Sequence, residues 1–167
     1  MSAILKLSKE DTDKLAELIN DISVAMVTTV TPDGALRSRP MARTRHSFDG
    51  ALWFFTADDS GKAIEVAHHD QVNVSFSEPK NERYVSISGG AHVTRDPAKA
   101  REMWNPMLKG WFPRGVEDPR LALLKVDIEH AEYWDAKSSM MLVFMSLAKA
   151  AATGTPPKNL GEHKKIA

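Results

Sequence analysis

The spacing of apolar residues along the chain changes from a helical period to a strand period. Near the start, apolar residues recur every three or four positions, which predicts a helix from Lys9 to Asp21 with Ser8 as its N-cap. The apolar face of this helix consists of Leu15, Leu18, Ile19 and Ile22. Beyond it, runs rich in Val, Thr and aromatic residues predict strands. The six predicted strands are Ser23–Thr31, Ala35–His46, Ala51–Thr56, Gln71–Ser77, Arg83–Thr94 and Leu121–Trp134.

Turn sequences between the first strands predict antiparallel hairpins. Thr31-Pro32-Asp33-Gly34 and Phe48-Asp49-Gly50 both contain residues that favour tight turns. Gly89-Gly90 interrupts the fifth predicted strand, which indicates a bulge or a sharp bend. Strands joined in series in this way predict a mainly β protein, a small antiparallel barrel with flanking helices.

The last strand and the remaining helices complete this prediction. Unbroken alternation from Leu124, Val126 and Ile128 puts three further residues on the same face, namely His130, Glu132 and Trp134. Three more helices are predicted at Lys62–His69, Pro97–Trp104 and Ser138–Ala152. In the first of them, Ile64 and Ala67 are expected to face inward. The polar segment that follows predicts one domain over residues 1–153 and a flexible tail over residues 154–167.

Composition and charge narrow the class of protein. The 167 residues contain 22 Lys and Arg and 22 Asp and Glu, a balance that argues against a dedicated nucleic-acid binder. The absence of cysteine excludes disulfides, thiolate metal sites and a catalytic thiol. No apolar run reaches the length of a membrane span, and the first residues lack a signal-peptide pattern. We therefore expect a cytoplasmic protein.

Four arginines occupy odd-numbered positions of the second predicted strand. Arg37, Arg39, Arg43 and Arg45 share one face if the strand is regular. They indicate either a solvated face of the sheet or an anion site, because guanidinium groups match phosphate oxygens. Pro40 lies among them and implies a sheet edge or a bulge.

A second candidate anion site lies between Thr56 and Lys62. Ser60 is placed to cap the helix that follows, and the free N–H groups of a helix start attract anions. Thr56 adds a hydroxyl, Gly61 permits close approach of the backbone, and Lys62 adds a charge. The alternative interpretation is an ordinary capped helix that binds no ligand. Asp58 and Asp59 count against an anion unless they point away.

Aromatic and histidine residues add less specific signals. Trp134 ends a strand, where a tryptophan can stack on a flat ligand, although packing is the commoner use. The six histidines have no metal-ligand spacing, so we expect them to be structural or surface residues. No P-loop, G-x-G-x-x-G motif or nucleophile elbow is present, which argues against a classical dinucleotide fold.

Several motifs in order resemble a known family. Arg39-Pro40-Met41-Ala42, Leu52-Trp53-Phe54-Phe55-Thr56 and Ser60-Gly61-Lys62 resemble the flavin-binding core of the pyridoxamine 5'-phosphate oxidase-like split barrels. Three later motifs resemble the general stress protein 26 branch, namely Trp111-Phe112-Pro113-Arg114-Gly115, Glu117-Asp118-Pro119 and Ala131-Glu132-Tyr133-Trp134-Asp135. The resemblance spans roughly Lys9 to Gly154.

The resemblance implies a homodimer of six-stranded antiparallel split β-barrels with FMN at the interface. By motif, the phosphate is expected at Arg39 or Arg43 together with Thr56, Ser60 and Lys62, next to Gly61. The backbone of Met41-Ala42-Arg43 is expected beside the flavin ring, and Phe55 is a further residue expected to bind the cofactor. Three aromatic residues are expected around the ring, namely Tyr84 from the partner chain, Trp134 and, as a weaker candidate, Trp111.

The resemblance also limits the activity. The oxidases carry Arg and His near the C-terminus for the substrate phosphate, whereas Ala136–Met141 contains neither. We therefore expect an FMN-binding oxidoreductase or flavin sensor with an unknown small-molecule redox partner, not a pyridoxamine phosphate oxidase, and FAD could replace FMN. The sequence also leaves open a flavin-storage protein, an anion- or RNA-binding barrel, and a split barrel for deazaflavin or haem, the last with His92 or His130 as ligand.

Overall fold

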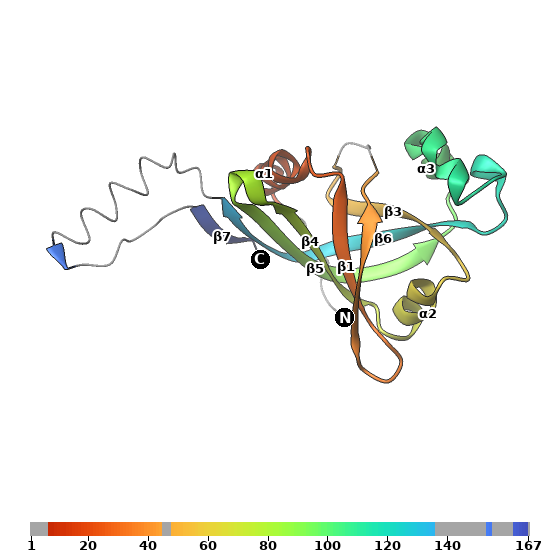
Figure 1. Cartoon of the computed structure of the whole chain (residues 1–167), viewed down its shortest axis with the longest axis horizontal. Coiled ribbons are helices and arrows are strands. Elements are labelled where there is room, and N and C mark those ends of the chain that lie inside the picture. The colour runs from red at the N-terminus through yellow and green to blue at the C-terminus, as the bar shows by residue number, and fades with distance from the viewer. Residues whose placement is uncertain (1–6, 45–47, 136–152, 155–161, 167) are drawn as a thin grey trace.

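The strands pair into one antiparallel sheet that curls into a split, half-open barrel (Figure 1). The computed structural model describes residues 7–44, 48–135, 153–154 and 162–166. Within them the strand order is β2-β1-β4-β5-β6-β3, and β7 pairs with β6 beyond this path. The mainly β, six-stranded antiparallel split barrel with flanking helices is confirmed, with β7 as an additional strand.

The predicted elements appear with small changes at their ends. The strands are β1 (Val24–Val30), β2 (Leu36–Ala42), β3 (Ala51–Ala57), β4 (Gln71–Glu78), β5 (Arg83–Thr94), β6 (Leu121–Asp135) and β7 (Glu162–Ile166). The α-helices are α1 (Lys9–Ile19), α2 (Gly61–His68) and α3 (Pro97–Met103). Three 3-10 helices are η1 (Pro79–Asn81), η2 (Pro106–Gly110) and η3 (Gly115–Glu117). The predicted helix Ser138–Ala152 and the segment Ala136–Met141 lie outside the described residues.

Local signals explain the first hairpin and the helix starts. The turn between β1 and β2 is closed by a hydrogen bond from Thr31 N to Ala35 O, and Gly34 takes a φ of +89°, which favours glycine. The side chains of Ser8, Ser60 and Asp96 each accept a backbone N–H at the start of α1, α2 and α3. These capping residues therefore set where the helices begin.

A bulge between β5 and β6 changes which residues face the core. The register shifts between Ser88 and Gly89, and a Cβ on Gly89 would collide with the backbone carbonyl of Asp127. After the bulge the buried residues of β6 are Ala131, Tyr133 and Asp135. The expectation that His130, Glu132 and Trp134 continue the core face is therefore wrong, because the extra residue of the bulge reverses the alternation.

Two hydrophobic clusters lie on the sheet. The main cluster fills the barrel under α1, and the predicted apolar face of that helix is buried in it. A smaller cluster joins α3 and η2 to β3 and β6, where Phe55 packs edge-on against Trp104 at 5.8 Å. On α2 the buried residues are Ala63, Glu65 and Val66, whereas Ile64 and Ala67 are exposed. The predicted inward face of this helix is therefore wrong.

Part of the predicted tail is a strand. Residues 162–166 form β7, which pairs with residues 131–135 of β6 and buries Ile166 in the main cluster. This differs from the expected flexible tail over those five residues, because the free edge of β6 offers unpaired backbone groups there. Among the described residues, no helix has both the length and the apolar character needed to cross a membrane.

Candidate functional site

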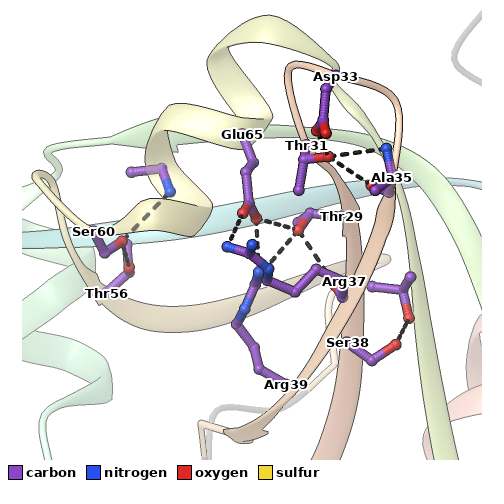
Figure 2. A network of polar contacts seen from close by, with 12 residues as sticks. Thr29, Thr31, Asp33, Ala35, Arg37, Ser38, Arg39, Thr56, Ser60 and Glu65 are labelled. Carbon is purple, nitrogen blue, oxygen red and sulfur yellow. Dashed lines mark hydrogen bonds and ion pairs between the residues drawn. The ribbon is translucent and has the colours of Figure 1, made fainter.

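A carboxylate on the buried face of α2 organises the polar side chains between α2 and the first hairpin. Glu65 is 3 % exposed and points from α2 toward β1 and β2, where Arg37 and Arg39 converge on it (Figure 2). Arg37 Nη1 donates to Glu65 Oε1 at 3.0 Å, and Arg39 Nη2 donates to Glu65 Oε2 at 2.7 Å. The regular alternation of β2 brings these two arginines to one face, as the sequence predicts.

Thr29 on β1 links the guanidinium of Arg39 to the carboxylate of Glu65. Its buried hydroxyl donates to Glu65 Oε2 at 2.5 Å and accepts from Arg39 Nη1 at 2.7 Å. Burial by itself raises the pKa of Glu65, but the hydrogen bonds from Thr29 and Arg39 and the nearby arginine charges outweigh it, so the net pKa lies below its usual value. Glu65 is therefore ionised near neutral pH.

Lys62 adds a third cation at the first turn of α2. Burial, followed by the positive charge of Arg39, lowers the pKa of Lys62, while Glu65 opposes this shift. Among the residues that the structure describes, Lys62 has no hydrogen bond or ion pair. Arg37, Arg39, Lys62 and Glu65, which we call the α2 cation cluster, thus combine three positive charges with one negative charge.

Hydroxyl groups lie at the helix start beside this cluster. Ser60 Oγ accepts from Ala63 N at 3.4 Å and is 3.0 Å from Thr56 Oγ1 (Figure 2). Gly61 has open space around its Cβ position. Asp58, which the sequence analysis counts against an anion, forms an ion pair with Arg95, so its charge is compensated.

The other arginines of the predicted face are separated from the cluster. Arg43 lies beyond the end of β2, where its Nη2 donates to the backbone oxygen of Asn20 at 2.8 Å. Burial lowers the pKa of Arg43, while Asp21 opposes this shift. Arg45 lies outside the described residues. Arg39, unlike Arg43, therefore lies near enough to Lys62 to act on it electrostatically.

At the end of β2, backbone groups rather than side chains are available to contact a ligand. β2 lies at one end of the strand order, and Met41 is buried in the main cluster. Arg43 N donates to Ser23 O at 2.9 Å, so by the antiparallel alternation the N–H of Ala42 points away from β1. Pro40 shares that orientation and therefore costs the ladder no donor, which fits the predicted edge position.

Three of the predicted aromatic residues do not join the α2 cation cluster within one chain. Trp111 follows η2 and is 70 % exposed. Tyr84 and Trp134 pair with each other across β5 and β6, and each is 41 % exposed. Thr56 pairs with Ala122, far from Trp134 along β6, and at about 3.3 Å per residue the separation is tens of ångströms. Phe55, the remaining aromatic residue that was expected to bind the cofactor, packs its side chain against the smaller hydrophobic cluster.

Comparison with known proteins places this geometry in a family. The family model described as pyridoxamine 5'-phosphate oxidase like matches residues 10–158. The chain belongs to this family. Protein bli-3 of Neurospora crassa is 30 % identical over 159 residues, which cover 85 % of this chain and 76 % of bli-3.

Solved structures in the same comparison confirm the split-barrel fold. A structure from Jannaschia sp. CCS1 has a TM-score of 0.75 at 24 % identity and covers 96 % of this chain and 99 % of its own. The general stress FMN/FAD binding protein of Xanthomonas citri has a TM-score of 0.67 at 31 % identity, over 80 % of this chain and 94 % of that chain. General stress protein 26 of Bacillus anthracis has a TM-score of 0.65 at 24 % identity, over 73 % and 92 %. Membership of the pyridoxamine 5'-phosphate oxidase-like family is thus confirmed, and the chain is similar to a general stress protein of known structure.

Sequence reasoning missed Glu65 and Thr29. Glu65 lies between two buried apolar residues of α2, and a carboxylate on a buried helix face requires charged or hydrogen-bonding partners. The arginines of β2 were the available signal, because they are cations that a buried carboxylate can pair with. Within the described residues, no group of three or more His, Asp or Glu side chains is arranged to hold a metal ion.

Proposed function

We propose that this chain binds FMN, with the flavin phosphate in the α2 cation cluster. The observation that carries the proposal is the charge imbalance around Glu65, where Arg37, Arg39 and Lys62 outnumber the carboxylates of Glu65 and of Asp33, which lies near Arg37, beside a helix start. A phosphate monoester carries between one and two negative charges near neutral pH, which matches the excess of positive charge. The flavin binding stated in the name of the Xanthomonas citri relative supports the same proposal.

Each residue of the phosphate site has a distinct role in this proposal. Arg39 keeps donors free after it binds Thr29 and Glu65, because a guanidinium carries five N–H groups. Lys62 provides a cation that makes no hydrogen bond or ion pair among the described residues, although Glu65 acts on it electrostatically. Ser60 and Thr56 provide hydroxyls at the start of α2, where the N–H groups of a helix start attract anions.

A homodimer completes the proposed site. The continuous register of β1, β4, β5 and β6 puts four apolar side chains on one face of the sheet, namely Val24, Met26, Tyr84 and Trp134. All four side chains are exposed. An exposed apolar face of this kind is typical of a protein interface. A second copy packed there would bring the partner's Tyr84 and the partner's Trp134 toward the flavin ring, while the outward N–H of Ala42 offers the ring a donor.

The chemistry of such a site belongs to the flavin, which when bound supplies electron or hydride transfer. The chain itself orients the cofactor through its phosphate and covers the ring with aromatic side chains. This supports a flavin-dependent oxidoreductase or a flavin sensor, with FMN, whose phosphate is terminal, as the proposed cofactor.

The test is the visible absorption spectrum of the purified protein, repeated after addition of FMN and desalting. We expect a retained flavin spectrum with shifted maxima and one FMN per chain. Gel filtration of the same sample is expected to give the mass of a dimer. A colourless protein that retains no FMN after desalting would contradict the proposal and would favour another anion as the ligand of the cluster.

A further inference from the structure

The position of Glu65 behind the two arginines is the least expected feature of the α2 cation cluster. A carboxylate in an anion site lowers the net positive charge and competes for the guanidinium donors. Glu65 is nevertheless buried and takes part in three hydrogen bonds, from Thr29, Arg37 and Arg39. Such an arrangement either weakens the site or holds its cations in place.

The geometry of Arg39 favours the second role. Its two terminal nitrogens are held separately, Nη1 by Thr29 at 2.7 Å and Nη2 by Glu65 at 2.7 Å. Two anchor points define the plane and the direction of a guanidinium, whereas one point leaves it free to rotate. The N–H groups that remain therefore keep a fixed direction before any ligand arrives, which lowers the ordering cost of binding.

Glu65 also allows the cations to lie close together. Arg37 and Arg39 both contact its carboxylate, on different oxygens, and Lys62 interacts electrostatically with both Arg39 and Glu65. Without the carboxylate, three positive charges would repel one another in a partly buried region. With it, the cluster keeps a net positive charge even when Asp33, which acts on Arg37, is counted, and this suits a phosphate monoester.

We propose that Glu65 is the positioning residue of the phosphate site, which holds Arg39 and Arg37 so that the site selects a ligand with a terminal phosphate monoester. This inference rests on the proposed binding of FMN. It assigns to Glu65 a role in affinity that the carboxylate exerts through the arginines, without touching the phosphate.

The test compares FMN with riboflavin, which has the same ring and no phosphate. Both dissociation constants are measured by flavin fluorescence titration for the native chain, for Glu65→Gln and for Glu117→Gln. The last variant is a matched control, because it removes the same charge from an exposed Glu–Arg pair with Arg101. We expect Glu65→Gln to weaken FMN binding about tenfold and to leave riboflavin within about twofold. The control is expected to change neither value.

Each outcome separates a positioning role from its competitors. A general loss of structure would weaken FMN and riboflavin alike, and this would overturn the inference. Tighter FMN binding by Glu65→Gln would also overturn it, because Glu65 would then compete with the phosphate for the arginines. If the native chain binds FMN no better than riboflavin, the phosphate site itself fails, and the proposed function fails with it.

A second variant keeps the test independent of the stability of Glu65→Gln. Thr29→Val is nearly isosteric and removes only the hydroxyl that links Arg39 to Glu65. We expect it to lower the ratio of FMN affinity to riboflavin affinity by about threefold, a smaller effect than that of Glu65→Gln. An unchanged ratio in both variants would overturn the inference while leaving FMN binding intact.

Discussion

Two clusters of cations among the described residues of the barrel differ in how their charges are balanced. In the α2 cation cluster, Arg37, Arg39 and Lys62 share the carboxylate of Glu65, and Asp33 acts in addition on Arg37 alone. In the second, which we call the Trp53 cluster, each of two lysines has its own carboxylate. Lys99 Nζ lies 3.3 Å from Asp49, and Lys125 Nζ lies 2.7 Å from Asp127.

The lysines of the Trp53 cluster are also occupied by an aromatic ring. Lys99 Nζ and Lys125 Nζ lie 5.4 and 5.5 Å from the centre of the Trp53 ring, which suits cation–π contacts. The Trp53 cluster thus has no excess of positive charge, because Glu102 also lies 3.6 Å from Lys99, whereas the α2 cation cluster retains positive charge. A group of basic residues indicates an anion site only when the carboxylates around it are too few to neutralise its positive charge.

The largest expected effect of breaking the α2 cation cluster is on stability. Glu65→Gln should lower the free energy of unfolding at pH 7 by about 3 kcal/mol, because it leaves partly buried Arg39 without its carboxylate. The native pKa of Glu65 lies below its ordinary value of 4.5, so its contribution is complete above that pH and is lost as the pH falls through the lowered value. Urea unfolding at pH 7 and at more acidic pH measures this difference.

The acid behaviour is the control within that experiment. The difference between the native chain and Glu65→Gln should narrow as the pH falls below about 4.5, because glutamine does not titrate. A difference of the same size at every pH would show that lost packing, rather than the charge of Glu65, causes the destabilisation.

The next effect is on cofactor affinity and contrasts the two clusters directly. Arg39→Ala and Lys62→Ala should each weaken FMN binding by roughly 10- to 100-fold, since a hydrogen bond to a charged group contributes about 1.5–3 kcal/mol. Lys99→Ala and Lys125→Ala are the matched controls, and FMN affinity should not change in either. Equal losses in all four variants would mean that overall charge, not the α2 cation cluster, determines binding.

Much of this arrangement could be predicted because its signals are local. Ser60 caps α2 in a position that depends only on its neighbours in sequence. Arg37 and Arg39 share a face because β2 is regular, and Pro40 is tolerated at its edge position. The motif order that joins Arg39, Thr56 and Ser60 to Lys62 then identified the family, which the family model confirms.

The remaining features depend on contacts between distant segments. Glu65 faces inward only because β2 provides arginines, and a helix viewed alone would instead turn Ile64 inward and Glu65 to solvent. Gly89 signals a bulge, yet which residue of β6 is skipped depends on the pairing of both strands, so the outward position of Trp134 was not predictable. The short charged strand β7 has too little alternation to be distinguished from a tail.

The smallest expected effect concerns the aromatic end of the sheet, which differs from both clusters in having no charge to bring to the flavin. Trp134→Ala should raise the fluorescence of bound FMN and weaken its affinity by roughly 1 kcal/mol, as expected for the loss of one aromatic contact. Trp111→Ala, which changes another exposed tryptophan, is the control and should affect both quantities less.

Because Trp134 lies tens of ångströms along β6 from Thr56, its influence requires the partner subunit. The effect of Trp134→Ala should therefore disappear when the protein is diluted until it is monomeric, whereas the effect of Arg39→Ala should persist. An effect of Trp134→Ala that is independent of protein concentration would contradict a flavin site shared between two subunits.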